Sequence, residues 1–324
     1  MKRSDIQTAW SEFSEDDGHH FSGEIFFDEL LSKHVYYKIG GPAEILLFPK
    51  SLEDLKVIRE FLHRMKTSLF FFGLGSNLLV SDDGIPGITL KLSKLNSSLM
   101  KLDPTALSAG ASVSVHSFLR LAAKEGLGGL EFLSGVPGNI GGAISMNAGT
   151  HLGECAQALK SFRVFSFSDT SIEEFPKADL RTVPVTSDLF SYRKNHAWNP
   201  MEIIFDSEWN YLLGTPEKVK NTLDETLRLR KATQPLDYPS CGSVFKNPEG
   251  TLMKAWEVVE KSGLRGLKIG AAQISEKHPN WIVNLGGAKA TDVIDLIERC
   301  QSEALEKFGV KLEPEVKRIG SFRT

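Results

Sequence analysis

Hydrophobic and polar positions follow two different periods along this chain. Between residues 52 and 65 the apolar positions recur every three or four residues, the spacing of an amphipathic helix. Ser51 and Asp54 stand where a capping box would begin that helix. Short apolar runs bounded by Gly, Pro or Asn predict strands at 43–48, 69–72, 88–92, 107–109, 162–167, 203–205, 281–284 and 316–319.

Helical spacing returns in four further segments, 114–125, 216–231, 252–261 and 292–308. Thr215 and Thr291 stand at two of the predicted starts, and Gly126 and Gly309 at two of the predicted ends. Helices and strands are mixed without strict alternation, which predicts an α+β fold. We expect a polar N-terminal tail or loose leading helix at 1–25, a first domain at 26–210 and a smaller domain at 211–324.

Composition and charge exclude several classes of protein. The chain has 324 residues, 41% hydrophobic and 24% charged, which is ordinary for a globular protein. A net charge of -3 gives no field for holding nucleic acid. The three cysteines are far apart, so we expect reduced thiols in a cytosol rather than a disulfide framework or a zinc site. The longest apolar run is broken at 73, which excludes a membrane span.

A first glycine loop follows the strand predicted at 69–72. Its residues are Gly73, Leu74, Gly75, Ser76 and Asn77. Glycines let a backbone approach a ligand closely, and successive N–H groups can point at phosphate oxygens. The loop is not a Rossmann fingerprint, because Leu78 stands at the third glycine position and no helical pattern follows. Taken alone, it also fits a tight turn between strands.

A second, longer glycine-rich stretch covers residues 134–149. It combines glycine, proline and asparagine within an apolar flank that indicates packing. Ordering so much glycine is costly, and a bound flat ligand bearing phosphates would explain it. A structural crossover loop is the alternative. The candidate cofactor-binding residues here are Ser134, Gly135, Val136, Pro137, Gly138, Asn139, Gly141, Gly142, Asn147, Ala148 and Gly149.

Segments 73–77, 126–143 and 146–149 together resemble the FAD-binding region of UDP-N-acetylenolpyruvoylglucosamine reductases, and 37–43 is similar to the opening motif of that family. The resemblance runs from Phe27 to Gly320. It implies a vanillyl-alcohol-oxidase-type FAD domain in two lobes, followed by a smaller α+β substrate domain. The chain departs from the family at Val35-Tyr36, where the family has two threonines.

The resemblance also implies roles for residues outside the glycine loops. Arg193, Ser243 and Glu315 correspond to the three catalytic residues of the family, with Ser243 as the general acid. Read as plain sequence, these positions are an ordinary surface arginine, a turn and a solvated carboxylate. Other implied contacts are Ile204 with FAD, and Tyr192, Lys246 and Asn247 with substrate. Either Arg228 or Arg230 could reach a diphosphate, and the residues leave open which of them does.

The implied reaction is reduction of UDP-N-acetylglucosamine enolpyruvate to UDP-N-acetylmuramate, with FAD and NADPH as cofactors. We expect a cytoplasmic monomer acting on this small UDP-sugar enolpyruvyl ether, with no metal and no nucleic-acid or membrane partner. The short interval between Arg193 and Ser243 indicates the shorter, type II-like subclass.

Two other functions stay open. One is another FAD oxidoreductase of the same fold, such as a sugar or alcohol oxidase. Those enzymes commonly attach flavin to a loop His or Cys, for which His116 and His151 are the nearest candidates. The other is a nucleotide-sugar binding protein without catalysis.

Overall fold

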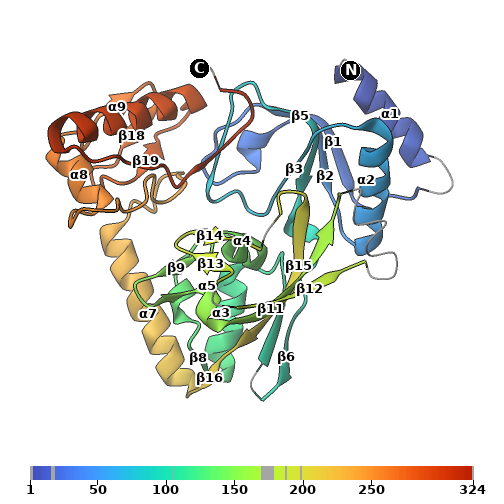
Figure 1. Ribbon diagram of the computed structural model, residues 1–324, viewed down its shortest axis with the longest axis horizontal. Coiled ribbons are helices and arrows are strands. Elements are labelled where there is room, and N and C mark those ends of the chain that lie inside the picture. The colour runs from blue at the N-terminus through green and yellow to red at the C-terminus, as the bar shows by residue number, and fades with distance from the viewer. Residues whose placement is uncertain are drawn as a thin grey trace. The chain divides into compact units, whose positions relative to one another are not determined.

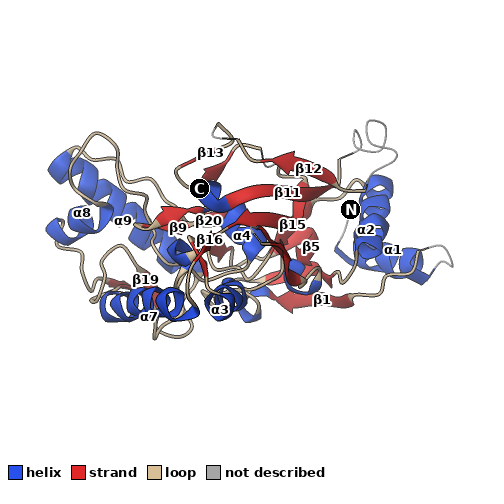
Figure 2. Ribbon diagram, turned by 90° about the horizontal axis from the view of Figure 1, so that it is seen from below, coloured by secondary structure: helices blue, strands red, loops and turns tan. Residues whose placement is uncertain are grey.

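A computed structural model describes residues 3–15, 19–104, 106–168, 179–186, 188–197 and 199–322 (Figure 1). Helices in this part of the chain are α1 (Arg3–Glu15), α2 (Leu52–Met65), α3 (Val115–Glu125), α4 (Ile140–Ser145), α5 (Cys155–Ala158), α7 (Pro216–Thr233), α8 (Ala255–Lys261) and α9 (Ala290–Phe308). Helices and strands follow one another without regular alternation, which agrees with the predicted α+β class, and Figure 2 shows both kinds of element.

The strands are mostly short. They are β1 (Glu24–Leu30), β2 (Pro42–Phe48), β3 (Leu69–Phe72), β4 (Leu78–Val80), β5 (Ile85–Lys91), β6 (Leu99–Asp103), β7 (Ala106–Gly110), β8 (Leu127–Gly128), β9 (Gly149–Thr150), β10 (Gly153–Glu154), β11 (Leu159–Ser166), β12 (Arg181–Pro184), β13 (Phe190–Ser191), β14 (Lys194–Asn195), β15 (Glu202–Asn210), β16 (Leu212–Leu213), β17 (Lys268–Ile269), β18 (Ala272–Ile274), β19 (Ile282–Asn284) and β20 (Lys317–Ile319).

The chain divides into two compact units. Unit 1 comprises Met1–Phe27, Ile45–Leu74 and Gly87–Arg228, and unit 2 comprises Asp28–Glu44, Gly75–Pro86 and Leu229–Thr324. These units do not coincide with the predicted limits at residues 25 and 210. Two N-terminal segments join unit 2 because β4 pairs with β20 and the Tyr37 hydroxyl donates to the carbonyl of Ile282 (2.9 Å).

Unit 1 is built around an antiparallel sheet with strand order β12-β11-β15-β7-β6. Its core includes Phe118, Phe162 and Trp209, all at 0% exposure. A further sheet has the order β1-β2-β5-β3, and the division between the units falls within β1, β2 and β5. The β11–β15 pair and the α3 helix form the scaffold beside which the second glycine-rich stretch folds.

The N-terminal segment is a packed helix rather than a polar tail. In α1, Ile6, Trp10 and Phe13 are buried at 3%, 0% and 8% exposure. The Trp10 ring lies edge-on to that of Phe61 of α2, with centroids 4.8 Å apart. Of the two expectations for these residues, the leading helix is the one that the structure contains.

In unit 2, β17, β18 and β19 form an antiparallel sheet, and α9 lies against β17 and β18. The core of this unit joins Leu296 of α9 to Tyr37, Leu79 and Phe245 from distant parts of the sequence. β4 pairs with β20 in parallel, with Leu78 opposite Lys317. This pairing places the end of the first glycine loop next to the C-terminal segment that contains Glu315.

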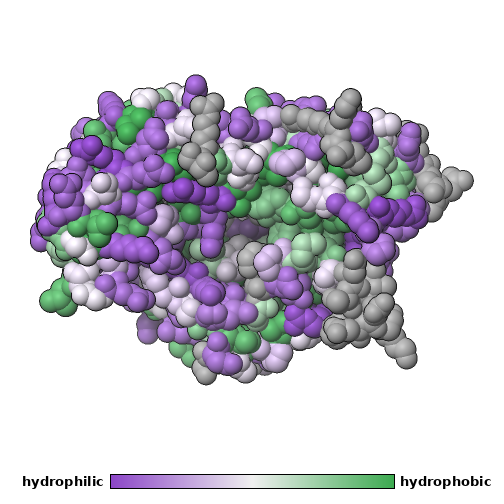
Figure 3. Space-filling model, turned by 45° about the horizontal axis from the view of Figure 1, so that its top comes forward, coloured by the Kyte–Doolittle hydropathy of each residue, from purple (hydrophilic) through white to green (hydrophobic). Residues whose placement is uncertain are grey.

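Hydrophilic side chains are spread over much of the face seen in Figure 3, with smaller groups of hydrophobic ones. Large hydrophobic side chains are exposed in separate places, such as Phe27 on β1 and Leu213 on β16, at 43% and 73% exposure. Within the described residues, every helix is too short or too polar to cross a membrane.

Candidate active site

Ser243 and Glu315 lie on segments that hydrogen-bond side by side in unit 2. Phe245 forms an antiparallel bridge with Pro314. The N–H of Glu315 donates to the carbonyl of Val244 (2.7 Å) on one side of this bridge. On the other side, the N–H of Lys246 donates to the carbonyl of Glu313 (2.9 Å). The structure therefore brings together the main chains of two of the three predicted catalytic residues, and both residues are half-buried.

Asn77, at the end of the first glycine loop, fixes the main chain of Glu315. Its Nδ2 donates to the carbonyl of Glu315 (3.1 Å), and its own carbonyl accepts from the N–H of Lys317 (3.0 Å). The predicted loop is divided between the units, with Gly73 and Leu74 in unit 1 and the remaining residues in unit 2. A predicted cofactor residue thus also holds a predicted catalytic one.

Asn280 supports the Ser243 segment from the opposite side. Its Oδ1 accepts from the N–H of Phe245 and its Nδ2 donates to the carbonyl of Phe245, both at 2.9 Å. The Asn280 carbonyl also accepts from the N–H of Val244 (2.8 Å). Residues 278–284 resemble a family segment that lines the substrate domain, but the sequence did not predict these contacts of Asn280, because an asparagine gives no signal of which main-chain groups it will meet.

The second glycine-rich stretch is anchored along its length in unit 1. The N–H of Ile140 donates to Val113 O and that of Gly141 to Ala111 O, both at 2.9 Å. The N–H of Val115 donates to the carbonyl of Gly138 (3.0 Å). The Ser134 hydroxyl, also predicted to meet the cofactor, donates to the carbonyl of Leu223 (3.1 Å).

The two glycine loops meet at Gly73. A Cβ added there would lie 2.1 Å from Oδ1 of Asn139, so the close approach requires glycine. Gly135 and Gly138 have φ of 70° and 130°, which a bulkier residue would adopt only with strain. Gly142 is exposed, and the single atom near its missing Cβ is that same Asn139 Oδ1 at 3.3 Å. At these glycines the loops therefore have main chain that no side chain covers, and such a surface fits a flat dinucleotide.

Four further predicted cofactor residues lie in this part of unit 1. Val136 and Ala148 are partly buried against the core of the unit, and Pro137 is exposed. Ile204 of β15 is 4% exposed and belongs to that core, opposite Val164. Any contact of Ile204 with a cofactor would therefore involve its main chain.

Arg193 occupies the tip of the β13–β14 hairpin in unit 1. Ser191 pairs with Lys194, so Tyr192 and Arg193 form the two-residue turn. The Arg193 φ of 58° lies in the left-handed region, which is uncommon for a residue other than glycine. Its Nη2 donates to the carbonyl of Gly149 (3.2 Å), and its guanidinium lies 5.0 Å from the centre of the exposed Tyr192 ring.

The other predicted substrate contacts have partners within the chain. Lys246 pairs with Glu313 (2.6 Å), and this hydrogen bond lowers the pKa of the Glu313 carboxyl. Asn247 Oδ1 accepts from the N–H of Ala255 at the start of α8 (3.2 Å). On α7, Arg228 pairs with Glu225 at 2.8 Å. Arg230 lies two positions further along, so the two arginines point in different directions from one helix.

The cysteines are free and buried. Burial raises the pKa of the Cys241 thiol well above its ordinary value, although this residue is close to Ser243 in sequence. The Cys241 Sγ donates to the carbonyl of Leu78 (3.1 Å). Cys241 is therefore a packing residue of the site and not a nucleophile.

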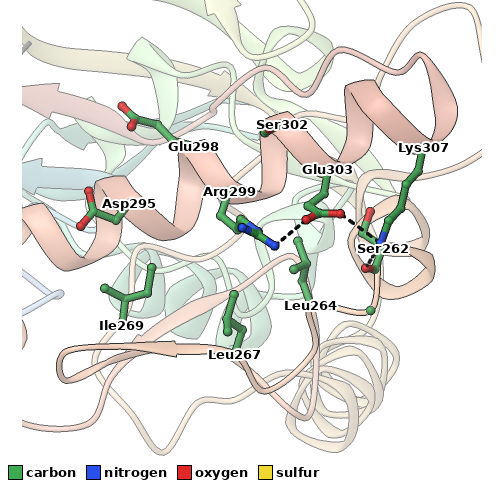
Figure 4. Close-up of a pocket in the computed structure, with 11 residues that line it drawn as sticks. Ser262, Leu264, Leu267, Ile269, Asp295, Glu298, Arg299, Ser302, Glu303 and Lys307 are labelled. Atoms are coloured by element: carbon green, nitrogen blue, oxygen red, sulfur yellow. Dashed lines mark hydrogen bonds and ion pairs between the residues drawn. The ribbon is translucent and has the colours of Figure 1, made fainter.

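A groove of about 750 Å³ on unit 2 is lined by residues of α9 and of the segment 262–269 (Figure 4). Along α9, Glu303 pairs with Arg299 (2.7 Å) and with Lys307 (3.0 Å). The Lys307 ammonium also donates to the carbonyl of Ser262 (2.9 Å). Glu303 is therefore paired with two cations, and the groove is lined by none of the predicted site residues.

Comparison with known proteins matches two family models. Residues 43–174 match an FAD binding domain, and residues 234–319 match the C-terminal domain of UDP-N-acetylenolpyruvoylglucosamine reductase. A reductase of this name from Listeria innocua is 39% identical over 296 residues, which are 91% of this chain and 95% of the relative. One from Pediococcus pentosaceus is 37% identical over 92% of this chain and 95% of its own. The chain belongs to the UDP-N-acetylenolpyruvoylglucosamine reductase family.

A solved structure of this family supports the assignment. The reductase from Thermus caldophilus superposes with a TM-score of 0.74 and 33% identity, covering 91% of this chain and 98% of that one. The family resemblance and the vanillyl-alcohol-oxidase type of FAD fold predicted from the motifs are thus confirmed. The FAD-binding match spans both glycine loops, and the C-terminal match spans Ser243 and Glu315.

Proposed function

We propose that this chain catalyses the NADPH-dependent, FAD-mediated reduction of UDP-N-acetylglucosamine enolpyruvate to UDP-N-acetylmuramate. The reaction would take place in the cytoplasm and supply the peptidoglycan precursors that bacterial cell shape and division require. The observation that carries the proposal is the match to reductases of this name over 91% of the chain. The main-chain pairing of the Ser243 and Glu315 segments also supports it, because it brings together two residues with predicted roles in the reaction.

The two glycine loops would hold FAD by their main chain, from 73 to 77 and from 134 to 149. FAD, when bound, supplies a carrier that accepts hydride from NADPH and delivers it to the substrate double bond. The Arg193 guanidinium would stabilise the negative charge that develops on the substrate carboxylate and the adjacent carbon. Glu315 would orient and polarise the same carboxylate.

Ser243 would complete the reaction as general acid. Its hydroxyl donates a proton to C2 of the enolpyruvyl group once hydride has reached C3. Serine is a weak acid, so its hydroxyl must be held within hydrogen-bond reach of a strongly basic carbon. The main-chain ties from Asn280 and Glu315 to residues 244 and 245 provide a rigid base for that position.

Visible spectroscopy of the purified protein tests the proposal. We expect a flavin spectrum that bleaches on anaerobic addition of NADPH and recovers on addition of UDP-N-acetylglucosamine enolpyruvate. A colourless protein that binds the sugar nucleotide would favour a binding protein. Flavin that stays with the precipitate after denaturation, with no recovery by the enolpyruvyl nucleotide, would favour a covalent sugar or alcohol oxidase.

A further inference from the structure

Asn147 lies in the Met146–Gly149 segment that the sequence associates with FAD, but its side chain is engaged within the protein. The residue has 0% exposure. Its Nδ2 donates to the carbonyl of Ser191 (3.1 Å), and its Oδ1 accepts from the N–H of Ala156 (3.0 Å). An amide group with both ends bonded to main chain is a strut between two segments rather than a ligand-facing group.

The segment that Asn147 joins is the hairpin that carries Arg193. Ser191 is the last residue of β13, directly before the Tyr192–Arg193 turn. A second contact comes from the same glycine-rich stretch, since the carbonyl of Gly149 accepts from Nη2 of Arg193 (3.2 Å). Residues 147–149 therefore hold both the base and the tip of the hairpin, whose strand β14 lies beside α4 (Figure 1).

Backbone conformation links the two residues further. Asn147 and Arg193 have φ of 42° and 58°. Asparagine adopts the left-handed region more readily than most residues, whereas for arginine this conformation is strained. Such a conformation persists only where surrounding contacts fix it. The bond to the Ser191 carbonyl is one of the contacts that can fix the turn.

We propose that Asn147 is a positioning residue for Arg193, acting through the Ser191 carbonyl, and that its side chain does not bind FAD. The inference rests on the proposed function, because it assigns Asn147 to the step in which Arg193 meets the substrate carboxylate. It also replaces the sequence-based interpretation of this asparagine as a cofactor ligand.

The test uses the FAD-loaded full chain with Asn147→Asp and Asn147→Gly. The aspartate keeps an acceptor for Ala156 and tolerates the same φ, but it loses the donor to Ser191. The glycine removes both bonds without straining the backbone. We expect unchanged FAD content and a rate of flavin reduction by NADPH within about twofold of wild type. Reoxidation by the enolpyruvyl nucleotide should slow by about 10-fold to 100-fold, because small misplacements of catalytic groups cost that much.

A double-mutant cycle with Arg193→Ala separates positioning from a merely structural role. If Asn147 acts through Arg193, adding Asn147→Asp to Arg193→Ala should slow reoxidation no further. Gln157→Ala is the matched control. Gln157 of α5 accepts from the N–H of Glu154 (3.3 Å), and its replacement removes this neighbouring contact without changing the hairpin. Its two half-reactions should match those of wild type.

Loss of FAD with parallel slowing of both half-reactions would make Asn147 a cofactor ligand and overturn the inference. Full additivity in the cycle would overturn it as well. If wild type itself failed to reduce the enolpyruvyl nucleotide, the proposed function would fall instead. The hairpin inference would then be decided by hydrogen exchange, where unchanged protection of the 191–194 amides in Asn147→Asp would contradict it.

Discussion

At the scale of single residues, the predicted catalytic side chains are held in different ways. Ser243 precedes two residues whose main chain is bonded to Asn280. Glu315 is fixed at both its N–H and its carbonyl. Arg193 is held in a left-handed turn. Each therefore has a backbone held by contacts with other parts of the chain.

Replacing Ser243 with alanine should separate the two half-reactions. We expect FAD reduction by NADPH at the wild-type rate and reoxidation by the enolpyruvyl nucleotide slowed by about 10²-fold to 10⁴-fold, the range for loss of a general acid. Rapid-mixing absorbance of the flavin measures both rates. Ser262→Ala, which removes a buried hydroxyl bonded to Val258 in α8, is the control. Wild-type rates in both half-reactions of Ser243→Ala would exclude the general-acid role.

His278 should make stability depend on pH. Burial lowers the pKa of His278 below its ordinary value of 6.5, and its Nδ1 accepts from the N–H of Asn280 (3.3 Å). The unfolded chain then takes up a proton before the folded chain as pH falls. The free energy of unfolding should therefore decrease from about pH 6.5 downward until the lower folded pKa is reached. Urea unfolding at several pH values should show a flatter profile for His278→Gln, and equal profiles would contradict this.

At the scale of helices and strands, local chemistry in the sequence predicted some ends and missed others. Ser51 and Asp54 form the predicted capping box of α2, and α3 ends at Gly126 as expected. α9 was expected to begin after Thr291 but starts at Ala290. The Asp82 carboxylate accepts from the N–H of Ala290 (2.8 Å), and the nearby Asp292 carboxylate accepts from the N–H of Lys289 (3.0 Å). The contact from Asp82 comes from so far along the chain that it leaves no local sequence pattern.

The same limit applies to α1 and to the site. The apolar positions of α1 are few and set among charged residues, so their burial depends on the partner surface of α2. Family motifs gave the identities of Ser243 and Glu315, but the bridge between Phe245 and Pro314 is a non-local pairing. Residues that serve such pairings, Asn280 above all, could be recognised only from the structure.

Removing the Asn280 side chain should loosen the Ser243 segment. Asn280→Ala leaves the N–H and carbonyl of Phe245 without their partner in a buried place, at a cost of about 1–3 kcal/mol for each group. Urea unfolding measures this loss of stability. Asn210→Ala, on an exposed position of β15, should change stability by less than about 0.5 kcal/mol. Equal urea midpoints for the two variants would show that the side-chain bonds of Asn280 do not stabilise the protein.

At the scale of the whole molecule, the predicted site residues are divided between the two units. Arg193 and the second glycine-rich stretch belong to unit 1, while Ser243, Glu315 and Asn77 belong to unit 2. The first glycine loop crosses the division between Leu74 and Gly75. A reaction that uses all these residues depends on both units being folded.

Removing FAD should lower the thermal stability of the protein. A ligand that binds only the folded chain stabilises it by about 2.7 kcal/mol at a free concentration 100 times its dissociation constant. We expect the flavin-free protein to melt several degrees below the loaded protein, and added FAD to restore the difference in a concentration-dependent way. Calorimetry checks this, with riboflavin, which lacks the pyrophosphate, as the control. Equal restoration by riboflavin would contradict pyrophosphate binding by the glycine loops.

The burial of Cys155, Cys241 and Cys300 has a practical consequence for following this protein in solution. Burial raises the pKa of the Cys300 thiol to about 12, so even this helix cysteine stays protonated and unreactive at neutral pH. A cysteine introduced in place of the fully exposed Leu252 would then react selectively with a maleimide fluorophore. The wild-type cysteines need not be replaced first, so the protein can be labelled with a fluorophore at this single position.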